Sequence, residues 1–148
     1  MKKKITVMVS GGFDTIHIGH IKMFQEAKKL GDKLVVIVNS DRFLKEKKGY
    51  AFMTLRERMM IIRSIACVDK VIRCCDSDQT VCRTLTIHRP DIFANGGDRK
   101  KGNIPEYDIC KRFGIKMVFN VGGNKKQSSS KLIRAVRKVK KIKKWRKY

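Results

Sequence analysis

Two glycines and two histidines lie close together near the start of the chain, in the segment SGGFDTIHIGH. Gly11 and Gly12 follow a run of β-formers, and the absence of a Cβ lets their backbone approach a phosphate closely. His17 and His20 are three positions apart at the start of a predicted helix, so both side chains can point to one side. Imidazole N–H groups beside a helix N-terminus favour bound anions. The segment therefore predicts a site that steadies charge during phosphoryl or nucleotidyl transfer.

Two basic residues further along the chain are candidates for binding the same phosphates. Lys48 stands before Gly49 in a lysine-rich loop, where Lys45 or Lys47 could take its place. A lysine in such a run is ordinarily only solvated. Arg58 carries a rigid fork of donors that suits a triphosphate, and its alternative role is a salt bridge on a helix surface.

Three consecutive serines form another candidate anion site. Ser128, Ser129 and Ser130 begin the last predicted helix. Their hydroxyls, together with the unpaired backbone N–H groups of a helix start, can bind phosphate oxygens. A plain serine N-cap is the alternative interpretation, and both can be true.

Strands and helices must alternate along the chain to position these groups. Continuous apolar, β-branched runs predict strands at residues 4–10, 33–40, 70–74, 90–95 and 115–121. Helical spacing and capping residues predict helices at 18–30, 55–66, 77–88 and 105–113, and one that starts near 129. Gly31 is expected to end the first helix, Thr54 and Glu57 to cap the second, Ser77 or Asp78 to cap the third, and residues 41–52 to form a polar connection.

This alternation predicts an α/β fold, a Rossmann-like open parallel sheet of five strands with helices on both faces. Ligands of such sheets bind beyond the carboxyl ends of the strands. Four unusual segments follow predicted strands: GGFDTIHIGH, NSDRFLKEKKG, NGGDR and GGNKKQSSSK. We expect them to meet at one rim of the sheet.

The chain is strongly basic, with 36 Lys and Arg against 13 Asp and Glu among its 148 residues, a net charge of +23. Residues 131–148 hold ten of the basic residues and no acid. The positive electrostatic field of these charges suits a phosphate-rich ligand, nucleic acid or an anionic surface. We expect one globular domain over residues 1–135 and a basic amphipathic helix or tail over 136–148.

Cysteine usage and hydropathy indicate the compartment. Five cysteines occur without a C-x-x-C pair, which argues against a zinc cage and favours reduced thiols. No apolar run reaches the ~20 residues of a membrane span, and we read no signal peptide. We therefore expect a cytoplasmic protein without a membrane span.

Several blocks together resemble one known family. GGFDTIHIGH resembles the G-x-F-D-x-x-H-x-G-H loop of the cytidylyltransferase-like nucleotidyltransferases, with His17-Ile18-Gly19-His20 as its signature. KKLGDKLVVIVNSD is similar to the segment that follows in the glycerol-3-phosphate cytidylyltransferase and heptose-phosphate adenylyltransferase groups. KKG at 47–49, Glu57-Arg58, GGD at 96–98 and QSSSKLI continue the match in order, so that it covers about residues 5–135.

The resemblance implies roles for individual residues. The catalytic residues would be His17 and His20, which stabilise the pentacoordinate transition state, together with Lys48 and Arg58, which bind phosphates. The nucleotide would be bound by Gly11, Gly12, Phe13, Asp14, Gly19, Gly96, Gly97, Asp98, Ser128, Ser129 and Ser130. No residue is expected to hold a metal alone, because Mg²⁺ would arrive on the oxygens of the triphosphate with its waters.

The resemblance also implies the reaction. CMP or AMP would move from CTP or ATP to a phosphorylated small molecule, a sugar or polyol phosphate, with release of pyrophosphate. A homodimer is expected by resemblance alone. A nearby variant is a pantetheine-phosphate or nicotinamide-mononucleotide adenylyltransferase, whose S-S-x-x-[IV]-R end is similar to SSSKLIR, although the GDKLVVIVNSD and NGGD blocks argue against it.

Two other functions compete with this one. The main alternative is a nucleic-acid-binding module that has lost catalysis, and the basic tail is the reason for it. The tail could also contact an anionic lipid surface. Class I aminoacyl-tRNA synthetases also contain H-x-G-H, but 148 residues leave no room for tRNA recognition.

Overall fold

The computed structural model describes residues 2–97, 99–100, 102, 104–123 and 128–142, the last four of these by their backbone only. This part of the chain contains five strands and six helices, which alternate except for two successive helices after the second strand. They are β1 (Thr6–Gly11), α1 (Ile18–Lys28), β2 (Lys33–Val38), α2 (Asp41–Lys48), α3 (Leu55–Arg63), β3 (Lys70–Arg73), α4 (Cys82–His88), β4 (Ile92–Gly96), α5 (Tyr107–Phe113), β5 (Lys116–Val121) and α6 (Ser129–Ile142).

The strands form one parallel sheet in the order β3-β2-β1-β4-β5. The chain starts at the centre of the sheet, adds β2 and β3 on one side, and then crosses to add β4 and β5 on the other. β1 therefore pairs with both β2 and β4, with Val7 opposite Leu34 and Ile92. This reversal of direction leaves a crevice beyond the carboxyl ends of β1 and β4, the place where open α/β sheets bind ligands.

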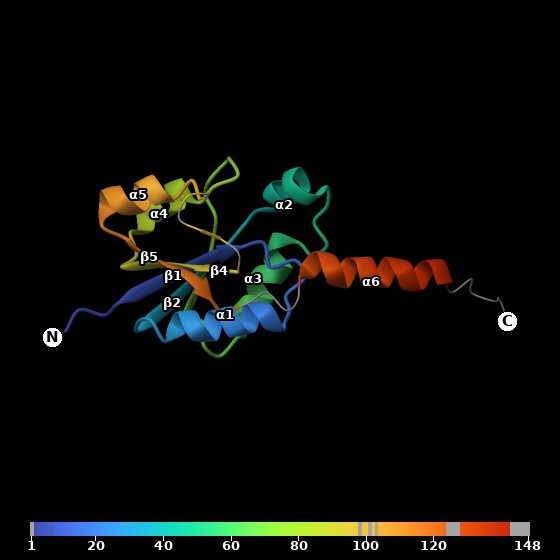
Figure 1. The fold of residues 1–148 in the computed structure, drawn as a ribbon, viewed down its shortest axis with the longest axis horizontal. Coiled ribbons are helices and arrows are strands. Elements are labelled where there is room, and N and C mark those ends of the chain that lie inside the picture. The colour runs from blue at the N-terminus through green and yellow to red at the C-terminus, as the bar shows by residue number, and fades with distance from the viewer. Residues whose placement is uncertain (1, 98, 101, 103, 124–127, 143–148) are drawn as a thin grey trace.

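Helices cover both faces of the sheet, as expected (Figure 1). Successive strand residues alternate between two cores, because side chains of a strand point to opposite faces. Val7 and Val9 pack in the core that contains Phe24 of α1 and Ile62 of α3. Met8 points the other way, into the core that contains Leu85 of α4. The near-continuous apolar sequence of β1 and β2 follows from burial on both faces.

Residues 41–52, expected to form a polar connection, contain a helix instead. Ser40 Oγ accepts a hydrogen bond from Phe43 N at 3.1 Å, and Gly49 ends α2 in the left-handed region with φ of 85°. The lysines of this helix hide it from hydropathy patterns, whereas Phe43 and Leu44 are buried beneath it.

Of the predictions about the ends of the first two predicted helices, one is confirmed and one is wrong. The capping box is confirmed, since Glu57 N donates to Thr54 Oγ1 and Thr54 N donates to Glu57 Oε2. The expectation that Gly31 caps the first helix was wrong, because the C-cap is Lys29. Gly31 instead lies against β1, where a Cβ would come within 2.8 Å of the carbonyl oxygen of Ile5.

The residue expected to cap the third predicted helix was also misjudged. Neither Ser77 nor Asp78 caps α4, which starts at Cys82. Asp76 takes this role, because its carboxylate accepts hydrogen bonds from the backbone N–H groups of Arg83 (2.7 Å) and Thr84 (3.0 Å).

All five cysteines are free thiols, and Cys74 and Cys110 are buried. Burial is the main cause that raises the pKa of each of these two thiols to about 11. Both therefore remain protonated at neutral pH and behave as small core residues rather than as nucleophiles.

The last helix extends away from the sheet (Figure 1). α6 continues through residues 135 and 136, where the sequence predicted the end of the domain. Its first turn approaches the loop between β1 and α1, since Ser129 Oγ donates to the carbonyl oxygen of Thr15 at 2.7 Å. No helix in the described part of the chain has the length and apolar character needed to cross a membrane.

Candidate active site

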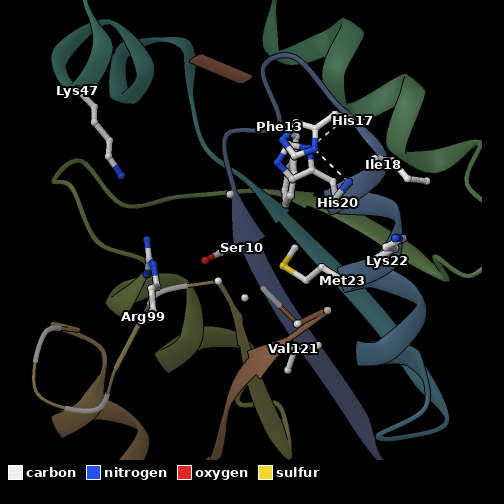
Figure 2. Close-up of a pocket in the computed structure, with 16 residues that line it drawn as sticks. Ser10, Phe13, His17, Ile18, His20, Lys22, Met23, Lys47, Arg99 and Val121 are labelled. Atoms are coloured by element: carbon white, nitrogen blue, oxygen red, sulfur yellow. Dashed lines mark hydrogen bonds between the residues drawn. The ribbon is translucent and has the colours of Figure 1, made fainter. Parts of the chain in front are cut away.

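A pocket of about 650 Å³ opens at the carboxyl end of the sheet. Its wall is contributed by the segments that follow β1, β2, β4 and β5, represented by His17, Lys47, Gly97 and Gly122 (Figure 2). The expectation that these four segments meet at one rim is confirmed. The volume lies within the range of small-molecule sites.

His17 and His20 stack on one another inside this pocket. Their ring centroids are 3.8 Å apart, and the ring planes are inclined by 27°. His17 Nδ1 accepts a hydrogen bond from Gly19 N at 3.1 Å, and His20 Nδ1 accepts one from His17 N at 3.2 Å (Figure 2). Because each Nδ1 is an acceptor, the proton of each neutral ring resides on Nε2. The helix cap thus sets both imidazoles as Nε2–H donors.

Phe13 fixes the orientation of His20. Its ring is 4% exposed and makes edge contacts with the rings of His20 and Phe24, each at 5.1 Å between centroids. Gly11 accommodates this ring, because a Cβ there would lie 2.8 Å from Phe13 Cζ. Both residues line the pocket, but Phe13 acts mainly as a support under the imidazole.

Glycine also allows the end of β5 to approach α1 closely. Gly122 has φ of 88°, and a Cβ there would lie 2.9 Å from Met23 Cα. Gly96 approaches the same methionine from β4, with Met23 Sδ at 2.6 Å from the position of a Cβ. Met23 consequently forms an apolar part of the wall between two glycine turns.

Among the lysines of α2, Lys47 rather than Lys48 lines the pocket. Adjacent residues of a helix are rotated by about 100° from one another, so only one of the pair faces inward. The ammonium of Lys47 also lies 5.6 Å from the centroid of the Phe43 ring. The choice of Lys48 as the phosphate ligand therefore shifts by one residue to Lys47, which the sequence left open.

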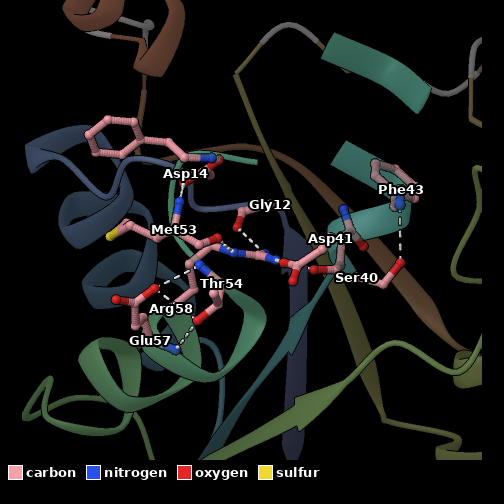
Figure 3. A network of polar contacts seen from close by, with 11 residues as sticks. Gly12, Asp14, Ser40, Asp41, Phe43, Met53, Thr54, Glu57 and Arg58 are labelled. Atoms are coloured by element: carbon pink, nitrogen blue, oxygen red, sulfur yellow. Dashed lines mark hydrogen bonds and ion pairs between the residues drawn. The ribbon is translucent and has the colours of Figure 1, made fainter. Parts of the chain in front are cut away.

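Arg58 occupies a different place from the one its motif predicted (Figure 3). Its side chain is completely buried. The guanidinium donates to the carbonyl oxygens of Met53, Gly12 and Asn39 at 3.1, 2.7 and 2.7 Å, and to Asp41 Oδ1 at 2.6 Å. These acceptors use four of its five N–H donors, and the side chain is completely buried, so the geometry does not support a direct triphosphate contact. Arg58 instead ties the loops after β1 and β2 to α3.

Asp14 and Gly12 are likewise structural. Asp14 is 1% exposed, and its carboxylate accepts hydrogen bonds from Phe52 N at 2.6 Å and Met53 N at 2.8 Å (Figure 3). Gly12 gives its carbonyl to Arg58, and a Cβ there would lie 2.5 Å from Leu44 Cδ2. Both residues hold the histidine loop rather than line the described pocket wall.

The three serines lie beside this loop and not in the described pocket wall. Ser128 Oγ accepts from Lys131 N at 3.1 Å, an N-cap contact. Ser129 is 7% exposed and anchors α6 to Thr15, two residues before His17. Ser130 is partly exposed. Asp98 and the lysines at 125 and 126 lie outside the described residues.

Two basic residues of the wall were not singled out from sequence. Lys22 stands two residues after His20 on α1, and Arg99 follows the Gly96–Gly97 turn. Sequence analysis could have identified both from their closeness in sequence to residues that it named as ligands. The described part of the wall contains Lys22, Lys47 and Arg99 but no carboxylate, so it favours an anionic ligand.

Comparison with known proteins identifies the family of the chain. Residues 8–136 match the sequence model of the family described as Cytidylyltransferase-like. The chain is 37% identical over 133 residues to the bifunctional protein HldE of Streptomyces coelicolor, a match that covers 88% of this chain and 28% of that protein. It is 38% identical over 102 residues to the FAD synthase of Thermococcus sibiricus, which covers 66% of each chain. The chain spans about a quarter of the length of its HldE relatives.

Solved structures share the fold. The lipopolysaccharide core biosynthesis protein of Thermoplasma volcanium superimposes with a TM-score of 0.69 at 29% identity, over 80% of this chain and 97% of that one. Pantoate-β-alanine ligase from Francisella tularensis, at 16% identity and a TM-score of 0.64 over 96% of this chain and 72% of that one, shares the architecture. With the family match over most of its length, the chain belongs to the cytidylyltransferase-like family of nucleotidyltransferases.

Proposed function

We propose that this protein transfers CMP or AMP from CTP or ATP to a phosphorylated small molecule, with a sugar or polyol phosphate as acceptor. A phosphate oxygen of the acceptor forms a bond to the α-phosphorus. The bond from that phosphorus to the bridging oxygen breaks, and pyrophosphate leaves with the electron pair. This in-line displacement asks the protein mainly to position its substrates and to neutralise charge.

The observation that carries the proposal is the pair of stacked imidazoles in a cationic pocket. His17 and His20 both present Nε2–H donors because their Nδ1 atoms cap α1. Hydrogen bonds from these donors to the α-phosphate and to the leaving oxygen would strengthen as charge builds up in the transition state. Donors that are fixed before the reaction need no reorganisation, which makes such contacts effective.

Lys47 and the N-terminus of α1 add positive charge around the same phosphate. Glycine turns at the ends of β4 and β5 leave room for the nucleoside. Mg²⁺ prefers oxygen ligands, and the described pocket wall offers it no carboxylate. The ion would therefore enter on the triphosphate, where it screens the charge of the phosphate chain.

The reaction can be tested by measuring pyrophosphate release. The protein is incubated with Mg²⁺, each nucleoside triphosphate and a panel of acceptors. Sugar and polyol phosphates represent the proposed class, whereas phosphopantetheine, nicotinamide mononucleotide and FMN represent the alternatives. Release that requires both a triphosphate and a sugar or polyol phosphate supports the proposal. Absence of release with every pair would contradict it.

A second candidate function is nucleic-acid binding by α6. Its residues Lys131, Arg134, Arg137 and Lys138 are exposed, and Val136 is 59% exposed although it belongs to the apolar stripe of the helix. The helix projects from the domain (Figure 1). A helix with this charge would bind phosphate backbones in a salt-dependent manner.

This candidate is tested by an RNA gel shift at several salt concentrations, with the full chain and with a chain that ends at residue 135. Loss of binding on truncation supports the function. Equal binding by the two chains would remove the part of α6 after residue 135 from consideration.

A further inference from the structure

The amino ends of the five strands form the edge of the sheet that lies opposite the pocket. An exposed basic residue stands at the start of every strand or within three residues before it. We call these residues the amino-edge cations; they are Lys4, Lys33, Lys70, Arg89 and Lys116. The start of β1 and α6 lie at opposite ends of the molecule, so this edge is a surface separate from the basic helix (Figure 1).

The acids of the same edge are used by the backbone. Three aspartates, each directly before a strand, accept hydrogen bonds from backbone N–H groups at the start of a neighbouring strand. They are Asp32 (from Ile5 N, 2.7 Å), Asp69 (from Leu34 N, 2.7 Å) and Asp91 (from Thr6 N, 2.9 Å). Asp69 and Asp91 also form salt bridges with Lys28 and Lys3. Within the described residues, none of the amino-edge cations makes a salt bridge, so the edge keeps an excess of positive charge.

The sheet sets the spacing of these charges. Neighbouring strands lie about 4.8 Å apart, so five strands spread the amino-edge cations over about 19 Å. The strand starts are staggered by only a few residues, since Lys33 lies opposite Thr6 and Lys116 lies opposite Ile92. Each strand of a nucleic-acid duplex carries one phosphate about every 3.4 Å along the helix axis. The row of cations therefore has the length of about five or six phosphates.

The surroundings of the row favour phosphates over lipid or unpaired bases. Peripheral proteins bind lipid by burying apolar side chains among the headgroups, but Ile5, beside the row, is only 38% exposed. Unpaired bases stack on aromatic rings. Phe113 is only partly exposed, and the guanidinium carbon of Arg89 lies 4.4 Å from the centroid of its ring. The edge thus fits the sugar-phosphate backbone of a duplex best.

We propose that the amino-edge cations bind the phosphate backbone of duplex nucleic acid without regard to base sequence. The contacts are charge-assisted hydrogen bonds from lysine and arginine to phosphate oxygens, and they release the counterions of the duplex. This binding is a function additional to the proposed transfer reaction and does not depend on it. The pocket opens at the carboxyl ends of the same strands, so a bound duplex leaves it accessible.

Fluorescence anisotropy with a labelled DNA duplex of about 20 base pairs tests the proposal in the full chain, at about 50 to 200 mM salt. The edge variant is K33Q/K70Q/K116Q. The matched control K45Q/R56Q/R83Q removes the same charge from exposed positions on α2, α3 and α4. A third variant, K33R/K70R/K116R, keeps every charge at the edge. All three variants retain α6, so any binding by that helix contributes equally to each.

For the edge variant we expect duplex affinity to fall about 10- to 100-fold. The slope of log affinity against log salt should become shallower by about 2 to 3, because each phosphate contact contributes about 0.9. The matched control should stay within about threefold of the wild type, since salt screens charges that lie away from the duplex. The arginine variant should bind like the wild type. Circular dichroism confirms that each variant folds.

Three other outcomes would count against the proposal. Unchanged duplex binding by the edge variant overturns it and assigns any binding to another surface, such as α6. Equal losses in the edge variant and the matched control overturn it as well, because the effect would then reflect net charge alone. Vesicles that contain anionic phospholipid provide the last arm, and tighter binding to them than to the duplex, lost in the edge variant, would identify a lipid surface instead. Pyrophosphate release is measured separately, so these outcomes leave the proposed function untouched.

Discussion

Arg58 and Arg99 show how differently the same side chain is used in two neighbouring regions. Arg58 lies below the histidine loop, is completely buried, and donates to three carbonyl oxygens and Asp41. Arg99 lies on the pocket wall and makes no ion pair among the described residues. The first region satisfies its charge internally, whereas the second places its charge on the wall of a pocket.

The two regions should therefore respond differently to substitution, because one supports the structure of the loop and the other lines the pocket. Removing a buried arginine that donates four hydrogen bonds should cost mainly stability, because its acceptors lose their partner inside the protein. Changes in the pocket should cost mainly activity, because those residues are solvated when no ligand is present. The following substitutions test this division.

The largest effect is expected from replacing both histidines by alanine. Loss of one donor to a transition-state oxyanion typically lowers kcat by about 10²- to 10³-fold, so H17A/H20A should lose at least that factor. Pyrophosphate release under saturating substrates measures it, and circular dichroism confirms the fold. A double variant with near-normal turnover would contradict the role of the imidazoles.

Replacing Arg58 by methionine should lower the free energy of unfolding by about 3 kcal/mol, since it leaves Asp41 and three carbonyl oxygens without a donor. The melting temperature would fall by roughly 10 °C for a domain of this size. R63M serves as the exposed control and should change little. If R58M melts normally but no longer binds nucleotide, the direct-contact prediction from the motif would be restored.

A smaller effect should distinguish the two lysines at the end of α2. K47M removes a charge from the pocket wall and should lower kcat/KM about tenfold, the size of one screened charge contact. K48M removes the same charge one residue away, outside the described wall, and should have the weaker effect of the two. Steady-state kinetics of both variants decides between them, and a larger loss in K48M would reverse our assignment.

The smallest effect is expected at the junction of α6 with the histidine loop. S129A removes the hydrogen bond to the carbonyl oxygen of Thr15 and should lower the free energy of unfolding by about 1 kcal/mol. Urea denaturation of S129A and S130A measures the difference, since among the described residues Ser130 makes no such hydrogen bond to the loop. Equal stability of the two variants would show that α6 is not anchored there.

Much of the fold was predictable because its signals are strong. β1 and β2 are buried on both faces, so their sequences are almost continuously apolar. The meeting of four loops at one edge of the sheet was predictable from the alternation of strands and helices. α2 was missed because its surface is nearly all charged, and only Phe43 and Leu44 turn inward.

The site was predictable at the level of segments and less so at that of side chains. A motif identifies which residue stands in a loop, but not whether its side chain points at a ligand or beneath the loop. For this reason Arg58 and Asp14 were taken for ligands, although both are buried supports. Lys47 and Lys48 could not be separated either, because that choice depends on the rotation of a helix that the sequence did not reveal.

The contact between Ser129 and Thr15 joins residues 114 positions apart in the sequence. β1 lies at the centre of the sheet, and its second edge can pair only after β4 has been synthesised. A nascent chain leaving the ribosome therefore exposes its histidine loop long before the opposite wall exists. A ligand that needs walls from both ends of the chain would therefore stabilise the domain only after β5 has been synthesised.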